Sequence, residues 1–170
     1  VKPLFWLGEF DELESPEYGK VFDASYSWKW MHKSADYYKK NEPLQELKDL
    51  LRQYSNIGDT SMRAWFTTNH DENSWNGTIQ SRLGAAEEAM TALTYVMPGM
   101  PLVYSGNEYG LKHSLKFFEK DSIPKTKGKE WELRAKLGQL KNENSDRIQI
   151  LTDGMFYDKD YFVERDFTKE

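Results

Sequence analysis

Three carboxylates stand at or shortly after the ends of short apolar segments of the sequence. They are Glu9, Asp71 and Glu108, and Asp71 ends the tripeptide Asn69-His70-Asp71. Carboxyl groups act as general acids and bases, and amide and imidazole groups form hydrogen bonds with polar ligands. Carboxylates that are distant in sequence but close in the fold are what acid/base chemistry on a glycosidic bond requires. These residues are therefore candidates for one site if the fold brings them together.

Short buried strands and amphipathic helices are expected to position these residues. Apolar runs of strand length cover 3–8, 21–24, 62–67 and 101–104. Apolar residues at helical spacing predict helices over 27–40, 44–54, 85–97 and 131–142. Strands that alternate with helices form βα units around a parallel sheet, which predicts the α/β class. In a (β/α) barrel the carboxyl ends of the strands share one face, where Glu9 and Asp71 would meet.

The segments between and after these elements have a different composition. A segment that holds Trp75 and Gly77 is expected to be a loop, and so is 111–129, which contains glycine, proline and several lysines. Past residue 144 the pattern changes to short apolar runs separated by turn residues, which is typical of antiparallel strands. The sequence therefore predicts a first unit over 1–144 and the start of an all-β unit over 145–170.

Composition and charge exclude several classes of protein. The chain has 170 residues, which is enough for a domain of ordinary size with a hydrophobic core. Its net charge of −5 argues against nucleic acid as the main partner. No apolar run approaches the roughly 20 residues that cross a bilayer, so no membrane span is expected. Localisation stays open, and a secreted or periplasmic location is compatible with a signal segment outside this sequence.

Three motifs together resemble one enzyme family. Phe66 and the tripeptide Asn69-His70-Asp71 form the pattern F-x-x-N-H-D, and 98–110 has the sequence PGMPLVYSGNEYG. With Trp6-Leu7-Gly8-Glu9 upstream, the motifs resemble strands five, seven and eight of the α-amylase family, glycoside hydrolase family 13, in the same order and spacing. The resemblance implies that 1–144 is the C-terminal half, strands 5 to 8, of a TIM (β/α)8 catalytic barrel. It implies that 145–170 begins the β-sandwich domain that follows this barrel.

The resemblance also implies roles for the residues at matching positions. Glu9 would be the general acid/base, which protonates the glycosidic oxygen and later activates water. Asp71 would be the family's third carboxylate, which holds the sugar and stabilises the charge of an oxocarbenium-like transition state. His70 and Asn69 would bind hydroxyl groups of that sugar. The residue before Glu108 departs from the usual family pattern, so no catalytic role is assigned there.

The parent enzyme implied by the resemblance acts on α-glucans such as starch and maltooligosaccharides by a retaining mechanism. A retaining glycosidase needs a second carboxylate as nucleophile. The family carries it on the strand before the acid/base, and only eight residues precede Glu9 in this sequence. The chain is therefore expected to be inactive alone, and its unpaired sheet edges favour self-association. No metal or cofactor is expected in this chain, although a calcium site in the parent enzyme stays open.

Two other classes of function remain beside the hydrolase. One is a non-catalytic α-amylase-like domain that binds carbohydrate or a partner protein, and the other is an unrelated α/β domain. Retention of Glu9, His70 and Asp71 together argues against a mere scaffold, which needs none of the three. Trp6 and Trp75 are candidate platforms for sugar stacking. The sequence leaves open α-1,4 or α-1,6 specificity, and hydrolysis or glucosyl transfer.

Overall fold

A computed structural model describes residues 4–57 and 61–144 of the chain. The β unit predicted over 145–170 lies outside these residues. Within the described ranges, no helix is long and apolar enough to cross a membrane.

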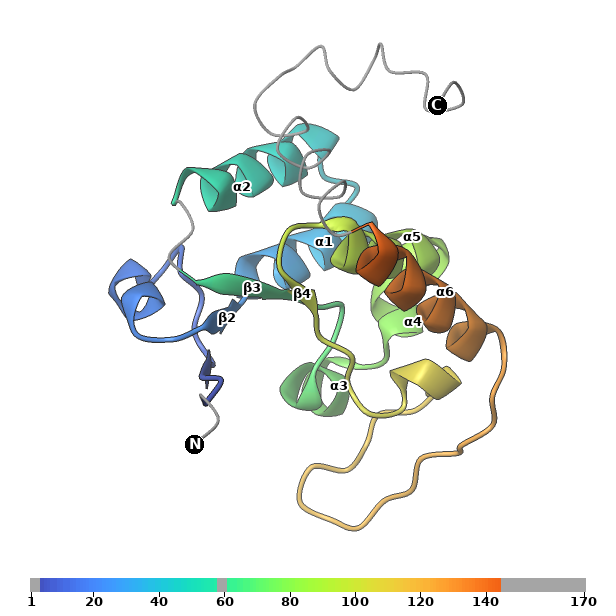
Figure 1. The fold of residues 1–170 in the computed structure, drawn as a ribbon. Helices are drawn as coiled ribbons and strands as arrows, with labels where there is room; N and C mark the ends of the chain where they lie inside the picture. The colour runs from blue at the N-terminus through green and yellow to red at the C-terminus, as the bar shows by residue number, and fades with distance from the viewer. Residues whose placement is uncertain (1–3, 58–60, 145–170) are drawn as a thin grey trace.

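Four short parallel strands form one sheet, in the same order as they occur in the chain (Figure 1). They are β1 (Leu7–Gly8), β2 (Ala24–Tyr26), β3 (Met62–Trp65) and β4 (Met100–Pro101). The register aligns Ala24 of β2 with Leu7 on one side and with Met62 on the other. Each strand therefore pairs with the next strand along the chain, as consecutive βα units do. This arrangement confirms the predicted α/β class with a parallel sheet.

Helices connect the strands and pack beside the sheet. They are α1 (Trp28–Lys40), α2 (Leu44–Asn56), α3 (His70–Asn76), α4 (Ile79–Leu83), α5 (Glu87–Val96) and α6 (Lys129–Glu143). Short 3-10 helices cover Pro16–Lys20, Gly84–Ala86 and Asn107–Tyr109. α1 packs against α2 and α4, α4 packs against α5, and α5 packs against α6 and β4. Five of these helices thus form a continuous series of packed neighbours, in the order α2, α1, α4, α5 and α6.

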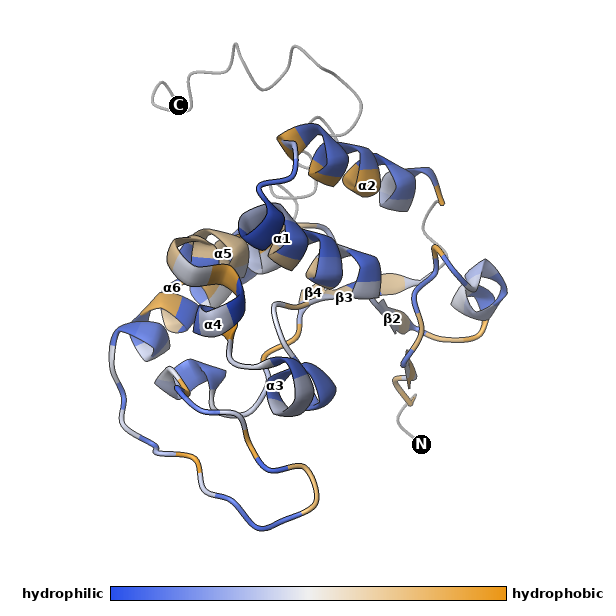
Figure 2. Cartoon of the chain, turned by 180° about the vertical axis from the view of Figure 1, so that it is seen from behind, coloured by the Kyte–Doolittle hydropathy of each residue, from blue (hydrophilic) through white to orange (hydrophobic). Residues whose placement is uncertain are grey.

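Aromatic side chains fill the core where the first two helices meet the sheet. The ring of Trp65 on β3 contacts Trp30 of α1 and Tyr54 of α2 edge to face, with centroid distances of 6.0 and 5.3 Å. Such contacts stabilise a core by more than the buried area alone. Figure 2 shows α1 and α2 as mostly hydrophilic ribbons with apolar stripes, whereas α5 is more apolar. The burial of these stripes is what the helical spacing of the sequence predicts.

The predicted helices are found with ends shifted by a few residues, but one predicted loop is wrong. The segment around Trp75 and Gly77 forms two short helices, α3 and α4. Each begins with a side-chain cap: Asn69 Oδ1 accepts a hydrogen bond from Glu72 N, and Thr78 Oγ1 accepts one from Ser81 N. These caps satisfy amide groups that a helix of this length otherwise leaves unpaired. The loop predicted over 111–129 is confirmed as far as the start of α6 at Lys129.

Gly99 makes the close approach of β4 to β3 feasible. Its φ angle is +111°, and an added Cβ would meet the carbonyl oxygen of Arg63 at 2.3 Å. We expect Gly99→Ala to lower the free energy of unfolding by about 1–3 kcal/mol. An alanine is strained at this positive φ angle, and its Cβ would clash with the carbonyl oxygen of Arg63. Gly138 is the matched control: it lies within α6 and an added Cβ meets nothing within 4 Å. Urea denaturation should show Gly138→Ala as neutral or stabilising, and equal effects of the two changes would contradict the argument.

Candidate active site

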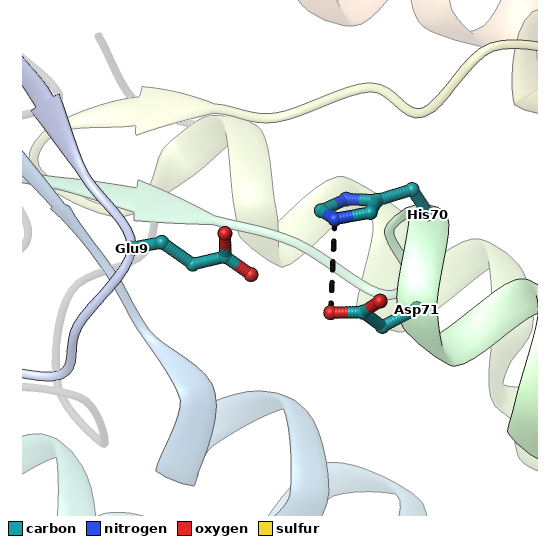
Figure 3. Close-up of side chains that lie close together, drawn as sticks. All are labelled: Glu9, His70 and Asp71. Atoms are coloured by element: carbon teal, nitrogen blue, oxygen red, sulfur yellow. Dashed lines mark ion pairs between the residues drawn. The ribbon is translucent and has the colours of Figure 1, made fainter.

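Glu9, His70 and Asp71 converge at the carboxyl ends of the strands (Figure 3). Glu9 directly follows β1, whereas His70 and Asp71 open α3, which follows β3. One side-chain oxygen or nitrogen of each residue lies within 4.8 Å of the others. His70 Nε2 is 3.7 Å from Asp71 Oδ2. Of the four residues given a site role by the sequence, the fold therefore brings together Glu9, His70 and Asp71. They come from the ends of two strands, β1 and β3, that are not neighbours in the sheet.

Buried contacts immediately after Glu9 hold it at the end of β1. The carbonyl oxygen of Phe10 accepts a hydrogen bond of 2.9 Å from the amide of Tyr26, so the chain continues beside β2. The buried carboxylate of Asp11 accepts hydrogen bonds from Lys29 N and from the Tyr54 hydroxyl. The segment is thus tied to β2, α1 and α2, while the side chain of Glu9 stays exposed. A group presented in this way is available to a ligand.

Asn69 lies differently from the other three candidates. Its side chain is buried, and Oδ1 caps α3 through Glu72 N at 2.9 Å. Nδ2 of Asn69 is also buried and has no hydrogen-bond partner among the described residues. The cap fixes the first turn of α3, which carries His70 and Asp71. Asn69 therefore acts on the candidate site through its neighbours in this structure, and contact with a sugar stays a prediction.

Tyr26 is a member of the site that the sequence did not single out. It ends β2, between the strands that carry Glu9 and Asp71, and its ring packs against Phe66 and Trp28. Burial raises the pKa of the Tyr26 hydroxyl, and the negative charges of Glu9 and Asp71 raise it further. The hydroxyl group therefore remains protonated and able to donate a hydrogen bond near both carboxylates. The only sequence signal for Tyr26 was its position just after the apolar run 21–24.

A buried ionic cluster lies on α3 and α4 beside the candidate site. Arg82 Nη1 donates a hydrogen bond of 3.1 Å to the carbonyl oxygen of Thr67 and lies 3.6 Å from Glu72 Oε2. His32 Nε2 lies 3.3 Å from the other oxygen of Glu72. Burial alone would raise the pKa of Glu72, but the hydrogen bond from His32 and the charge of Arg82 hold it below its ordinary value. The cluster joins α1, α3, α4 and the segment after β3.

Glu108 closes its own turn. Its Oε2 accepts a hydrogen bond of 2.9 Å from the amide of Gly106, just before the 3-10 helix Asn107–Tyr109. This contact ties the carboxylate to its own backbone turn. Of the three strand-end carboxylates, two lie together, and the third stabilises backbone geometry.

The cluster of Glu9, His70 and Asp71 can bind polar ligands in more than one way. Two carboxylates and an imidazole at this spacing are able to coordinate a divalent cation. The same groups can hold and protonate a sugar, since they offer a proton donor, a negative charge and a hydrogen-bond donor. The choice between these uses depends on the family to which the fold belongs.

Comparison with known proteins identifies that family. The profile of the α-amylase catalytic domain matches residues 8–160. Two of the similar solved structures are a noncanonic maltogenic α-amylase from Thermotoga neapolitana and an α-amylase from Lactobacillus plantarum. They are 25% and 24% identical to this chain, with TM-scores of 0.71 and 0.65, and cover 84% and 81% of it. An α-amylase from H. orenii is 20% identical, with a TM-score of 0.65 over 85% of the chain.

The matches cover only part of the larger proteins. This chain spans 33%, 36% and 37% of the three solved structures. No curated protein matches it. The family profile nevertheless covers most of the sequence and includes Glu9, His70 and Asp71. The chain belongs to the α-amylase family, through the catalytic domain of that family.

Proposed function

We propose that this chain supplies the acid/base side of an active site that hydrolyses α-glucans with retention of configuration. The observation that carries the proposal is the convergence of Glu9, His70 and Asp71 at the carboxyl ends of two strands. This is the edge at which barrel enzymes place their chemistry. The three solved relatives are named α-amylases, which supports an α-glucan as the substrate class.

Glu9 acts as the general acid and then as the general base in this proposal. In its protonated form it donates a proton to the glycosidic oxygen as the bond to the anomeric carbon breaks, and the resulting carboxylate later accepts a proton from water. Asp71 stays ionised and stabilises the positive charge that develops on the sugar ring. His70 and Tyr26 donate hydrogen bonds to the sugar hydroxyls or to the carboxylates that hold them.

A retaining mechanism also needs a second carboxylate as the nucleophile. This carboxylate belongs on the strand that would pair with the free edge of β1, and we place it in the other half of a (β/α)8 barrel. Leu4, Phe5, Trp6 and Leu7 are all exposed along that edge. Met62 on β3 and Val103 after β4 are exposed as well. Apolar side chains in these positions are expected where a further strand and a barrel interior would cover them.

Measurement of reducing-sugar release from maltoheptaose tests the proposal. The chain alone is expected to release none, because the proposal places the nucleophile in the other half of the barrel. A barrel completed with the complementary half of a related α-amylase is expected to hydrolyse the substrate. Turnover by the chain alone that Glu9→Gln abolishes would show that the nucleophile lies within it. A completed barrel that binds maltoheptaose without turnover would favour the non-catalytic alternative.

The free sheet edges predict the association state of the isolated chain. An exposed edge strand with apolar neighbours pairs readily with another copy. Multi-angle light scattering is therefore expected to show dimers or larger species at micromolar concentration. Phe5→Lys and Leu7→Lys place charges at and just before β1 and should shift the chain towards monomer, whereas Leu140→Lys at an exposed position of α6 should not. A stable monomer that none of these changes affects would contradict the half-barrel arrangement.

A further inference from the structure

Three exposed aromatic rings form a patch that begins at the candidate active site. The ring of Phe117 stacks on His70 with a centroid distance of 6.4 Å and an interplanar angle of 27°. Phe117 also contacts Trp75 at 5.4 Å and Phe118 at 4.8 Å. Exposed fractions are 61% for Trp75, 43% for Phe117 and 84% for Phe118. Scattered exposed rings need no explanation, but a contiguous group beside a site indicates a binding surface.

Two segments far apart in the sequence build this patch. Trp75 lies on α3, the helix that carries His70 and Asp71 at its other end. Phe117 and Phe118 lie on the long loop between the 3-10 helix Asn107–Tyr109 and α6. The rings of Trp75 and Phe118 also contact each other edge to face, at 6.2 Å. A ligand that leaves the candidate site along α3 would therefore meet the faces of these rings.

Hydrogen bonds hold the loop in place. The buried Oδ1 of Asn73 on α3 accepts a hydrogen bond of 2.7 Å from the amide of Leu115. The carboxylate of Asp121 accepts hydrogen bonds from the amides of Lys116 and Ser122, which closes the turn that carries the two phenylalanines. These contacts position the rings although packing leaves them exposed. Such preorganisation lowers the entropic cost of binding a ligand.

We propose that Trp75, Phe117 and Phe118 form an aromatic platform for a further glucose unit of the α-glucan, next to the unit held at His70 and Asp71. This inference rests on the proposed function and extends it to substrate length. The apolar C–H faces of a pyranose ring complement flat aromatic faces, and its hydroxyl groups project at the edge. Charged side chains at the rim of the patch, Lys116 and Glu119, can bind those hydroxyl groups. Lys116 and Glu119 also pair with each other, with Nζ 2.7 Å from Oε2, so the rim of the patch is polar and suits a ligand that carries hydroxyl groups.

Calorimetric titration of maltoheptaose into the 170-residue chain tests the platform. Trp75→Ala and Phe118→Ala are each expected to weaken binding about tenfold, because each removes one stacking face. Trp75→Phe keeps a flat ring and should retain most of the affinity. Phe5→Ala is the matched control, because Phe5 is 57% exposed, lies just before β1 and is not part of the patch. It is expected to leave the affinity unchanged. The wild type should bind maltoheptaose more tightly than maltotriose, and the two alanine variants should lose this difference.

Asp71→Ala separates the platform from the proposed function. If binding depends on Asp71 but is the same in Trp75→Ala and Phe118→Ala, the platform is overturned and the proposed function stands. If binding depends on Trp75 and Phe118 but not on Asp71, the platform stands and the proposed function fails. A wild-type chain that binds no maltoheptaose overturns the platform, whereas the proposed function is decided by hydrolysis in the completed barrel. Unchanged affinity with a lower average mass in light scattering would show that the patch contacts protein, and it would overturn the platform.

Discussion

In a completed barrel, Glu9→Gln is expected to lower the rate of maltoheptaose hydrolysis by about a thousandfold. Glutamine keeps the size of the side chain but can neither donate a proton to the leaving oxygen nor accept one from water, and such proton transfers contribute roughly 10²–10⁴-fold. The Michaelis constant should change far less, because the amide still forms hydrogen bonds. Steady-state kinetics with reducing-sugar detection would measure both values.

Two controls make the Glu9 result specific. Glu108→Gln changes another glutamate near a strand end, whose carboxylate binds the amide of Gly106, and it should cost less than tenfold in rate. An aryl glucoside with a good leaving group needs little protonation, so Glu9→Gln should slow bond cleavage much less with that substrate. A Glu9→Gln enzyme within tenfold of the wild type on maltoheptaose would remove Glu9 from the mechanism.

Arg82→Met is expected to lower the free energy of unfolding by about 3–5 kcal/mol. Both Arg82 and Glu72 are buried, and loss of the guanidinium group leaves the Glu72 carboxylate uncompensated in the interior. The carbonyl oxygen of Thr67 also loses its donor. Urea denaturation at neutral pH would measure the effect. Lys40→Met removes an exposed ion pair with Asp36 and should cost no more than about 1 kcal/mol.

The pH dependence and a double variant test the cause of the Arg82 effect. The pKa of Glu72 is lowered in the folded chain, so its contribution to stability is full above the ordinary value of 4.5 and is lost as the pH falls through the folded-state pKa. The difference between the wild type and Arg82→Met should therefore shrink in acid. Glu72→Gln combined with Arg82→Met should recover much of the loss at neutral pH. A deficit that is the same at all pH values, and in the double variant, would point to packing alone.

Apolar periodicity predicted the long helices well, and short apolar runs marked the neighbourhood of all four strands. α1 and α2 bury side chains at helical spacing, such as Leu47, Leu50 and Tyr54, so the apolar pattern marks them directly. α3 has the sequence HDENSWN, which has no apolar stripe, and it depends on the cap from Asn69 and on buried Glu72. No local pattern reports such tertiary support. The helix was therefore missed, although Asn69 and Gly77 at its ends were available signals.

The sequence predicted only part of the candidate site, namely the residues that lie at the ends of strands. Glu9 and Asp71 lie together because strand ends in a parallel sheet meet at one edge, which follows from topology alone. The contribution of Tyr26 needed the knowledge that β2 lies between β1 and β3. The contact between Phe117 and His70 needed the path of a long loop, which no spacing rule gives. Residues on regular elements were thus accessible to sequence reasoning, and residues on the loop were not.

The strand order of the sheet has a consequence for protein engineering. Because each strand pairs with its neighbour in the chain, a cut between two βα units separates one strand pair and leaves the others intact. Glu9 lies next to the edge strand β1, so a complementing piece that pairs with this edge brings its own side chains towards Glu9. Two polypeptides that are each inactive alone, as we propose for this chain, would form a split reporter, in which release of a coloured leaving group from a chromogenic sugar reports that two fused proteins have met.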